Sequence, residues 1–250
     1  MTNTKPCALI LHGWGREAGR QQTALIAYLS SRGYGVCVPQ FCNTDRFSIE
    51  EVRHAVIQSL HERVPGIIVG ISLGGLILPP LATLFPQSKL IFLATGPRLA
   101  FQNWVLRKAL PFFGTATGSS VFSLLRKVPF DLFLSVYMFF GTRLVSIERS
   151  PDDLLHDMAE NVKVLKDITP QFQRDIVRFV TSVDNADSLR KLPNKTLIIS
   201  GSHDPLMPLA LGQELHRLIP DSKLCITQTR DHATVFLESV YPHVDAFLKD

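Results

Sequence analysis

The stretch IIVGISLGG, residues 67–75, joins an apolar, strand-like run to a helical segment that reaches about Leu84. Ser72 stands at the junction, with Gly70 and Gly74 on either side of it. A turn this sharp between a strand and a helix leaves no room for flanking side chains, and it lifts the serine oxygen out of the sheet. The stretch therefore predicts that Ser72 is a nucleophile, with a plain tight turn as the alternative.

The same rhythm of apolar runs and helical segments continues in both directions. Ser48 is a good N-cap, and Glu51 three residues later completes a capping box. Pro79 and Pro80 fall in the second turn of the helix after Ser72, so we expect a kink or a shortened helix there. We expect strands at residues 8–11, 35–40, 67–71, 90–94, 196–200 and 223–228, and helices at residues 21–31, 48–61, 74–84, 209–218 and 235–248.

The predicted fold class is α/β, because continuous apolar strands separated by helices are typical of a parallel sheet covered on both faces. We expect a mostly parallel, doubly wound sheet of about six strands. Residues 97–192 interrupt this pattern with a helical, aromatic-rich segment that has no convincing strand. The prediction is therefore a core made of residues 1–96 and 193–250, with residues 97–192 inserted as a helical cap over the carboxyl ends of the strands.

The segment LHGWG, residues 11–15, closes the first strand. Glycines after a strand let backbone amides turn toward a ligand, and an amide here can act together with the amide that follows the nucleophile as an oxyanion hole. We predict that the backbone N–H groups of Trp14 and Leu73 form this hole. His12 is interpreted as a structural loop residue, and a role as the base is the alternative.

Two later loops supply an acid and a base. Asp204 lies in GSHDP, residues 201–205, just past a strand end, where an Asx turn before the proline is the alternative interpretation. His232 follows the last predicted strand. With Ser72, these residues predict a nucleophile, its base and the acid that orients the base. His203 is interpreted as a bystander, and the weaker alternatives for the acid are Asp184, Asp187 and Asp231.

The chain order Ser, Asp, His and the motifs around it resemble the α/β-hydrolase superfamily across the whole sequence. Within it, HGWG, GISLGG, GSHDPLMP and the late histidine are similar to the esterases that cleave the methyl ester of pimeloyl-acyl-carrier protein in biotin synthesis. The resemblance implies a helical cap and oxyanion amides at Trp14 and Leu73. It also implies a serine carboxylesterase acting on an acyl-linked, thio-linked or methyl ester of a medium acyl chain, and the mechanism needs no metal or organic cofactor.

The sequence departs from this family in three places. It starts almost at the first parallel strand, where the family has a β-hairpin, and residues 39–45 lack the glycines of an Asp-x-x-Gly-x-Gly loop. Ile71 stands where the biotin-pathway esterases have an aromatic residue. These differences leave other functions open: a lysophospholipase or lipase, a C–C hydrolase, a cofactor-free haloperoxidase, or a non-catalytic α/β hydrolase that binds a ligand or partner.

Composition excludes several broad classes. The net charge of the 250 residues is only +4, and no run of basic and aromatic residues indicates nucleic-acid binding. The four cysteines form no CxxC pattern, which favours reduced thiols in a cytoplasmic protein. Residues 1–5 do not resemble a signal peptide. The apolar run at residues 128–141 is interrupted by Asp131 and is shorter than the roughly 20 residues of a membrane span.

The predicted cap is both basic and aromatic. Between residues 97 and 150 seven basic side chains stand against Asp131 and Glu148. The hypothesis is an acyl chain under the cap helices and an anionic carrier or head group outside, such as an acidic acyl-carrier protein held by Arg126, Lys127 and Arg143. An anionic membrane surface and a plain solvated helix face are the alternatives. The residues predicted to contact substrate are Trp14, Phe101, Trp104, Phe133 and Tyr137.

Overall fold

The computed structural model describes residues 5–14, 20–41, 45–100, 104–141, 151–229, 232 and 240–250. Within them the chain forms a six-stranded sheet with strand order β2-β1-β3-β4-β5-β6, and every pairing is parallel. This confirms the predicted α/β fold class. The strands are β1 (Cys7–Leu11), β2 (Gly35–Cys37), β3 (Pro65–Ile71), β4 (Lys89–Leu93), β5 (Thr196–Gly201) and β6 (Ser222–Thr227).

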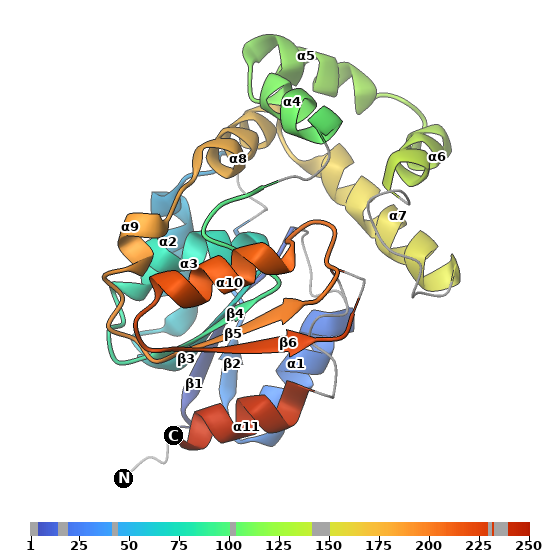
Figure 1. Cartoon of the computed structure of the whole chain (residues 1–250). Helices are drawn as coiled ribbons and strands as arrows, with labels where there is room; N and C mark the ends of the chain where they lie inside the picture. Colours follow the sequence, from blue (N-terminus) through green and yellow to red (C-terminus); the bar gives the residue numbers. More distant parts are fainter. Residues whose placement is uncertain are drawn as a thin grey trace.

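Helices cover both faces of the sheet (Figure 1). On one face lie α1 (Arg20–Ser31) and α11 (Tyr241–Lys249), and on the other lie α2 (Ile49–Leu60), α3 (Leu73–Ala82) and α10 (Leu209–Leu218). The central strands are apolar on both sides because alternate residues enter two separate buried clusters. The sheet is therefore doubly wound, as the sequence predicted.

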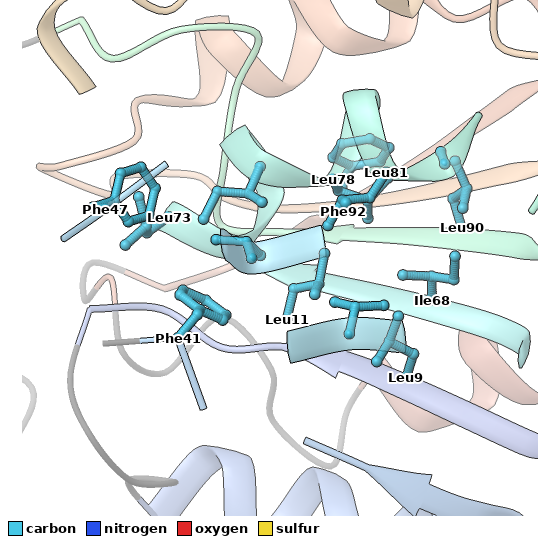
Figure 2. Close-up of a cluster of buried hydrophobic side chains, with 14 of the residues drawn as sticks. Leu9, Leu11, Phe41, Phe47, Ile68, Leu73, Leu78, Leu81, Leu90 and Phe92 are labelled. Carbon is cyan, nitrogen blue, oxygen red and sulfur yellow. The ribbon is translucent and has the colours of Figure 1, made fainter. Parts of the chain in front are cut away.

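One of these clusters includes Leu73, the residue that follows the predicted nucleophile. Figure 2 shows strand side chains and leucines of α3 packed together, with Phe41 and Phe47 at one end beside Leu73. Phe41 and Phe47 come from the connection between β2 and α2. The cluster fixes the start of α3 relative to β1, β3 and β4. The labelled strand residues are Leu9, Leu11, Ile68, Leu90 and Phe92.

Local signals set most element boundaries. The Ser48 hydroxyl accepts a hydrogen bond from the Glu51 N–H at 3.1 Å, so the predicted N-cap of α2 is present. The predicted strand 35–40 is wrong in length, since β2 ends at Cys37. Pro39 has no N–H to donate to a neighbouring strand, which accounts for the early end. Of the predicted helix 235–248, residues 235–239 lie outside the described residues, and α11 begins at Tyr241.

The two prolines of α3 sit inside the helix, which ends at Ala82, two residues before the predicted end. Pro80 lacks an N–H and leaves the Leu76 carbonyl without its helical donor. The side-chain amide of Asn185, itself buried, donates to that carbonyl at 2.8 Å. A distant side chain thus replaces the hydrogen bond that proline removes.

Helices fill the chain between β4 and β5, and in the described part of residues 97–192 there is no strand. This confirms the helical character predicted for the segment. In Figure 1, α4 to α7 extend away from the sheet and α8 leads back to it. None of the described helices has the length and apolar character needed to cross a membrane. The inserted helices are α4 (Trp104–Phe113), α5 (Ala116–Leu125), α6 (Phe130–Gly141), α7 (Pro151–Asp167), α8 (Pro170–Ser182) and α9 (Ala186–Leu189).

Three cysteines are free thiols. Cys7 on β1 and Cys37 on β2 are buried, with their sulfur atoms 3.6 Å apart, and Cys225 is partly buried. Burial raises the pKa of the Cys7 thiol to about 11, helped by the neighbouring Cys37. These thiols are therefore packed side chains, as predicted, while Cys42 lies outside the described residues.

Candidate active site

Ser72 occupies a strained turn between β3 and α3. Its backbone has φ 49° and ψ −111°, a conformation that residues with a side chain rarely adopt. Two neighbours on β4 and its following loop hold it there. The Ser72 N–H donates to the Leu93 carbonyl at 2.9 Å, and the Thr95 hydroxyl donates to the Ser72 carbonyl at 2.8 Å. The turn that presents the serine is thus fixed by the sheet.

The glycines beside Ser72 are required by close contacts. A Cβ atom at Gly74 would lie 2.0 Å from the Leu11 carbonyl oxygen of β1, and one at Gly70 would lie 2.8 Å from the Gly75 Cα. Both distances are far inside van der Waals contact. The steric reason for glycine that the sequence suggested is therefore present on both sides of the serine.

Three residues predicted from separate loops meet at this turn. The His232 Nε2 lies 2.9 Å from the Ser72 Oγ, and its Nδ1 lies 2.6 Å from the Asp204 Oδ2. The Asp204 side chain is fully buried, whereas 17% of the His232 side chain is exposed. One ring nitrogen, Nε2, thus accepts from the serine hydroxyl, and the other, Nδ1, donates to the carboxylate. This arrangement can take a proton from Ser72 and stabilise the resulting imidazolium.

Asp204 also makes the Asx turn that was the alternative interpretation. Its Oδ1 accepts hydrogen bonds from the backbone N–H groups of Leu206 at 2.8 Å and Met207 at 2.9 Å. Its Oδ2 is left for His232. Three donors compensate for the burial of this carboxylate, and the turn fixes the oxygen that faces the imidazole. The two interpretations therefore describe two oxygens of the same side chain.

The other candidate residues have different partners. The Asp184 carboxylate accepts from the Ala186 N–H at the start of α9, and the highly exposed Asp187 pairs with Arg190. His203 is exposed, with its Nδ1 2.9 Å from the Ser202 hydroxyl. Asp231 lies outside the described residues.

The loop after β1 lies against Ser72. A Cβ built on Gly13 would be 3.5 Å from the Ser72 Cβ, so the backbone of this loop approaches the serine closely. Leu73 is the first residue of α3, and N–H groups in the first turn of a helix lack helical acceptors. The two amides predicted for an oxyanion hole, those of Trp14 and Leu73, thus belong to the two segments that meet at Ser72.

His12 shapes this loop. Its ring is buried and stacks on Phe41, with centroids 4.0 Å apart and planes 8° apart. Burial lowers the pKa of His12, although its hydrogen bond with the backbone opposes the shift, so the imidazole is neutral. With Nδ1 protonated, it donates to the Gly13 carbonyl at 2.7 Å. That carbonyl shares a peptide group with the Trp14 N–H, so His12 orients the peptide that carries a predicted oxyanion donor.

The predicted substrate contacts have mixed outcomes. Phe133 lies on α6, where the Lys166 ammonium is 5.7 Å from its ring centroid, which places it in the packing of α6 on α7. Trp104 and Tyr137 lie on α4 and α6, but their side chains are outside the described ones. Phe101 also lies outside the described residues. Trp14 is partly buried against the main apolar cluster.

Sequence reasoning missed an apolar cluster that adjoins the site. Leu76 lies on α3, four residues after Ser72, and Leu211 lies on α10. Met207 is the residue whose backbone N–H donates to the Asp204 carboxylate. Residues before α4 and residues of α8 pack against these three side chains, so a buried apolar cluster adjoins the candidate triad. The sequence signal that could have predicted this cluster is the pair of apolar residues Met207 and Leu211, which stand four residues apart after the Asp-Pro turn. The packed neighbours are Leu99, Ala100, Phe179, Val180 and Val183.

The basic residues predicted to hold a carrier differ in exposure. Arg126 is half-buried, and its guanidinium donates to the Ile168 carbonyl between α7 and α8. The Lys166 ammonium in turn donates to the Arg126 carbonyl at 2.6 Å. Lys127 is exposed, and Arg143 lies outside the described residues. Arg126 therefore joins helices of the insertion, and Lys127 is left as the exposed member of the described pair.

The sequence of the chain matches a known protein family. The sequence model of the alpha/beta hydrolase family matches residues 8–240. The chain belongs to the alpha/beta hydrolase family. The predicted resemblance to this superfamily is thereby confirmed.

Two relatives of this alpha/beta hydrolase are pimeloyl-[acyl-carrier protein] methyl ester esterases. The one from Vibrio cholerae serotype O1 is 26% identical over 245 residues, covering 92% of this chain and 89% of that protein. The one from Vibrio vulnificus is 25% identical over 240 residues, with 93% and 89% covered. Such esterases support the enzyme class predicted from the sequence, a carboxylic ester hydrolase.

Solved structures share the fold. A thermophilic esterase from Thermogutta terrifontis superposes with a TM-score of 0.72 at 16% identity, covering 99% of this chain and 91% of that one. A bromoperoxidase from Bacillus anthracis has a TM-score of 0.71 at 20% identity, with 99% and 93% covered. At these identities the likeness shows the fold, and the chemistry must be argued from the site.

Proposed function

We propose that this alpha/beta hydrolase is a serine carboxylesterase in which Ser72 is the nucleophile, His232 the base and Asp204 the acid that orients the base. The observation that carries the proposal is the hydrogen-bonded chain from the Ser72 Oγ through His232 to the buried Asp204. The strained backbone of Ser72 supports it, since such strain persists where function requires it.

The proposed reaction has two acyl-transfer steps. His232 removes the Ser72 proton through Nε2 while the serine oxygen attacks the ester carbonyl, and Asp204 stabilises the imidazolium. His232 then protonates the departing alcohol, which leaves an acyl group on Ser72. His232 then takes a proton from a water molecule that attacks this acyl-enzyme, and it returns the proton to the Ser72 oxygen as the carboxylic acid leaves. In both steps the backbone N–H groups of Trp14 and Leu73 hold the negative oxygen of the tetrahedral intermediate.

The proposed substrate is an ester of a medium acyl chain, such as pimeloyl-acyl-carrier-protein methyl ester in biotin synthesis. The names of the two Vibrio relatives support it. In this proposal residues 1–96 and 193–250 form the hydrolase core and residues 97–192 the cap. The free thiols support the predicted cytoplasmic location.

The test is intact-protein mass spectrometry after reaction with a fluorophosphonate probe. The parent protein and the exposed-serine control Ser120→Ala should each gain one adduct, and Ser72→Ala should gain none. The same proteins are assayed on p-nitrophenyl esters from acetate to laurate, where hydrolysis should peak at a medium chain length. A folded parent protein with neither adduct nor turnover would show that the proposal is wrong and would favour a non-catalytic binding protein.

Substrate class needs a second set of assays. Lysophospholipids and vinylogous diketones, the substrates of lysophospholipases and C–C hydrolases, are compared with a methyl ester of an acyl-carrier-linked acid. Preference for the carrier-linked methyl ester would support the biotin-pathway assignment. Faster turnover of either alternative would keep the nucleophile and replace the proposed substrate.

A further inference from the structure

Helix α5 exposes an apolar face to solvent. Val121, Leu124 and Leu125 are 37%, 66% and 41% exposed, and their spacing places them on one side of the helix. The opposite side, with Ser119 and Phe122, is buried against neighbouring helices. The solvent-facing side of a surface helix is normally polar. Apolar side chains gathered on the exposed side of α5 therefore indicate an interaction surface.

Helix α5 lies at an extremity of the molecule. In Figure 1, α5 is at the top, and α4 and α8 lie between it and the sheet. Both of these helices pack against α5. Phe112, near the end of α4, adds a further exposed aromatic side chain to the same pair of helices. We call the exposed side chains of Phe112, Val121, Leu124 and Leu125 the α4–α5 face.

Basic residues accompany the α4–α5 face. Arg107 and Lys108 on α4 and Lys127 after α5 are exposed. The sequence from Val64 to Phe130 contains no aspartate or glutamate, so no carboxylate on α4 or α5 offsets them. Arg126 is not counted among these basic residues, because its guanidinium donates a hydrogen bond to the Ile168 carbonyl within the insertion. Three exposed basic side chains therefore share the α4–α5 helix pair and the turn that follows it with the exposed apolar ones.

We propose that the α4–α5 face docks this protein on an anionic lipid surface. Leucine side chains enter the boundary between head groups and acyl chains, while lysine and arginine bind the phosphates around them. An acidic protein partner would also match the basic residues, and it is one of the outcomes that the test distinguishes. A lipid surface provides both chemistries and requires no groove. This inference does not depend on the chemistry at Ser72.

The test is flotation of the full chain with vesicles. Half of the lipid is phosphatidylglycerol in one preparation, and all of it is phosphatidylcholine in the other. The parent protein should bind the anionic vesicles at least tenfold more tightly, and high salt should weaken binding. Leu124→Asp should lower binding to anionic vesicles at least tenfold. The matched control is Val64→Asp, at a residue of similar exposure before β3, and it should bind as the parent does.

The charge component is tested in the same way. Lys127→Glu should weaken anionic binding, whereas Lys191→Glu, the same change at an exposed site after α9, should weaken it much less. Hydrolysis of p-nitrophenyl acetate and the thermal transition should be unchanged in Leu124→Asp, which separates lost docking from lost folding. Failure at Ser72 would appear in hydrolysis, and failure of docking would appear in flotation.

Several outcomes would overturn the docking proposal. The parent protein failing to float with anionic vesicles would do so, as would equal flotation of the parent and Leu124→Asp. Light scattering that shows a dimer abolished by Leu124→Asp would assign the face to a second copy of the chain. Binding of acyl-carrier protein that is lost in Leu124→Asp, without vesicle binding, would assign it to a protein partner.

Discussion

His12 offers a sharp test of how the loop after β1 supports the proposed oxyanion hole. His12→Phe keeps an aromatic ring of similar shape to stack on Phe41. It removes the Nδ1–H that donates to the Gly13 carbonyl at 2.7 Å. It also removes Nε2, which is buried and, among the described residues, has no hydrogen-bond partner. The substitution therefore changes polarity at one peptide group and little else.

The expected fall in activity is not accompanied by a loss of stability. Loss of one hydrogen bond costs about 1 kcal/mol, and removal of an unsatisfied buried nitrogen returns about 1–3 kcal/mol. The free energy of unfolding should thus stay level or rise. Complete loss of an oxyanion donor costs about 3–4 kcal/mol in the transition state. A Trp14 amide that is present but poorly oriented should cost about 1.4 kcal/mol, which is roughly tenfold in kcat.

The assay combines urea unfolding with kcat and KM for a p-nitrophenyl ester. We expect kcat to fall while KM changes little, because the hydrogen bond strengthens in the transition state. The control His203→Phe makes the same change at an exposed histidine next to Asp204, and its kcat should be unchanged. An unaltered kcat in His12→Phe, or a fall in kcat that tracks a loss of several kcal/mol of stability, would refute the reasoning.

Three further predictions concern the site and its scaffold. Asp204→Asn should lower kcat roughly a thousandfold or more with the fold retained, measured by steady-state kinetics and circular dichroism, because an amide cannot stabilise the imidazolium. Gly74→Ala should destabilise the protein by about 2–4 kcal/mol in urea unfolding, because its Cβ would overlap the Leu11 carbonyl. Hydrogen bonds from Arg32 and Tyr28 lower the pKa of Asp245 to about 2. Its stabilising contribution should therefore be present above about pH 4 and be lost as the pH falls to 2, a loss that Asp245→Asn should flatten in thermal unfolding.

Each of these has a matched control. Gly66→Ala adds the same methyl group where the nearest atom is 3.8 Å away, and it should leave stability nearly unchanged. Asp187→Asn removes an exposed carboxylate and should change neither kcat nor the acid limb of the stability profile. If Gly74→Ala were as stable as Gly66→Ala, the close approach of α3 to β1 would be wrong.

Local patterns in the sequence sufficed for the elements around the nucleophile. The apolar run before Ser72, the two glycines and the helical segment after it are adjacent in the chain, so their sterics can be argued without a fold. The N-cap at Ser48 is equally local. The predicted strand runs past the end of β2 because the apolar run continues through Val38, whereas Pro39 has no N–H to donate.

Side-chain exposure in the insertion was beyond the sequence. The sequence predicts the same role for Arg126 and Lys127. In the folded chain, however, Arg126 is partly buried and Lys127 is exposed. Arg126 reaches a carbonyl at Ile168, which is 42 residues away along the chain. A similar long-range contact lets Asn185 serve the carbonyl that Pro80 leaves free. Such pairings depend on how helices pack, and no short spacing encodes them.

By itself the sequence determined the fold class, the strand-end loops and the residue types of the candidate site, because these follow from periodicity, glycine sterics and the order of loops on a parallel sheet. Only the tertiary structure decided that the Asp204 carboxylate divides its two oxygens between a turn and His232. It also decided that His12 faces the Gly13 peptide and that the leucines of α5 face outward. The physical reason is that direction and burial are properties of packed elements, which the linear pattern of side chains does not contain.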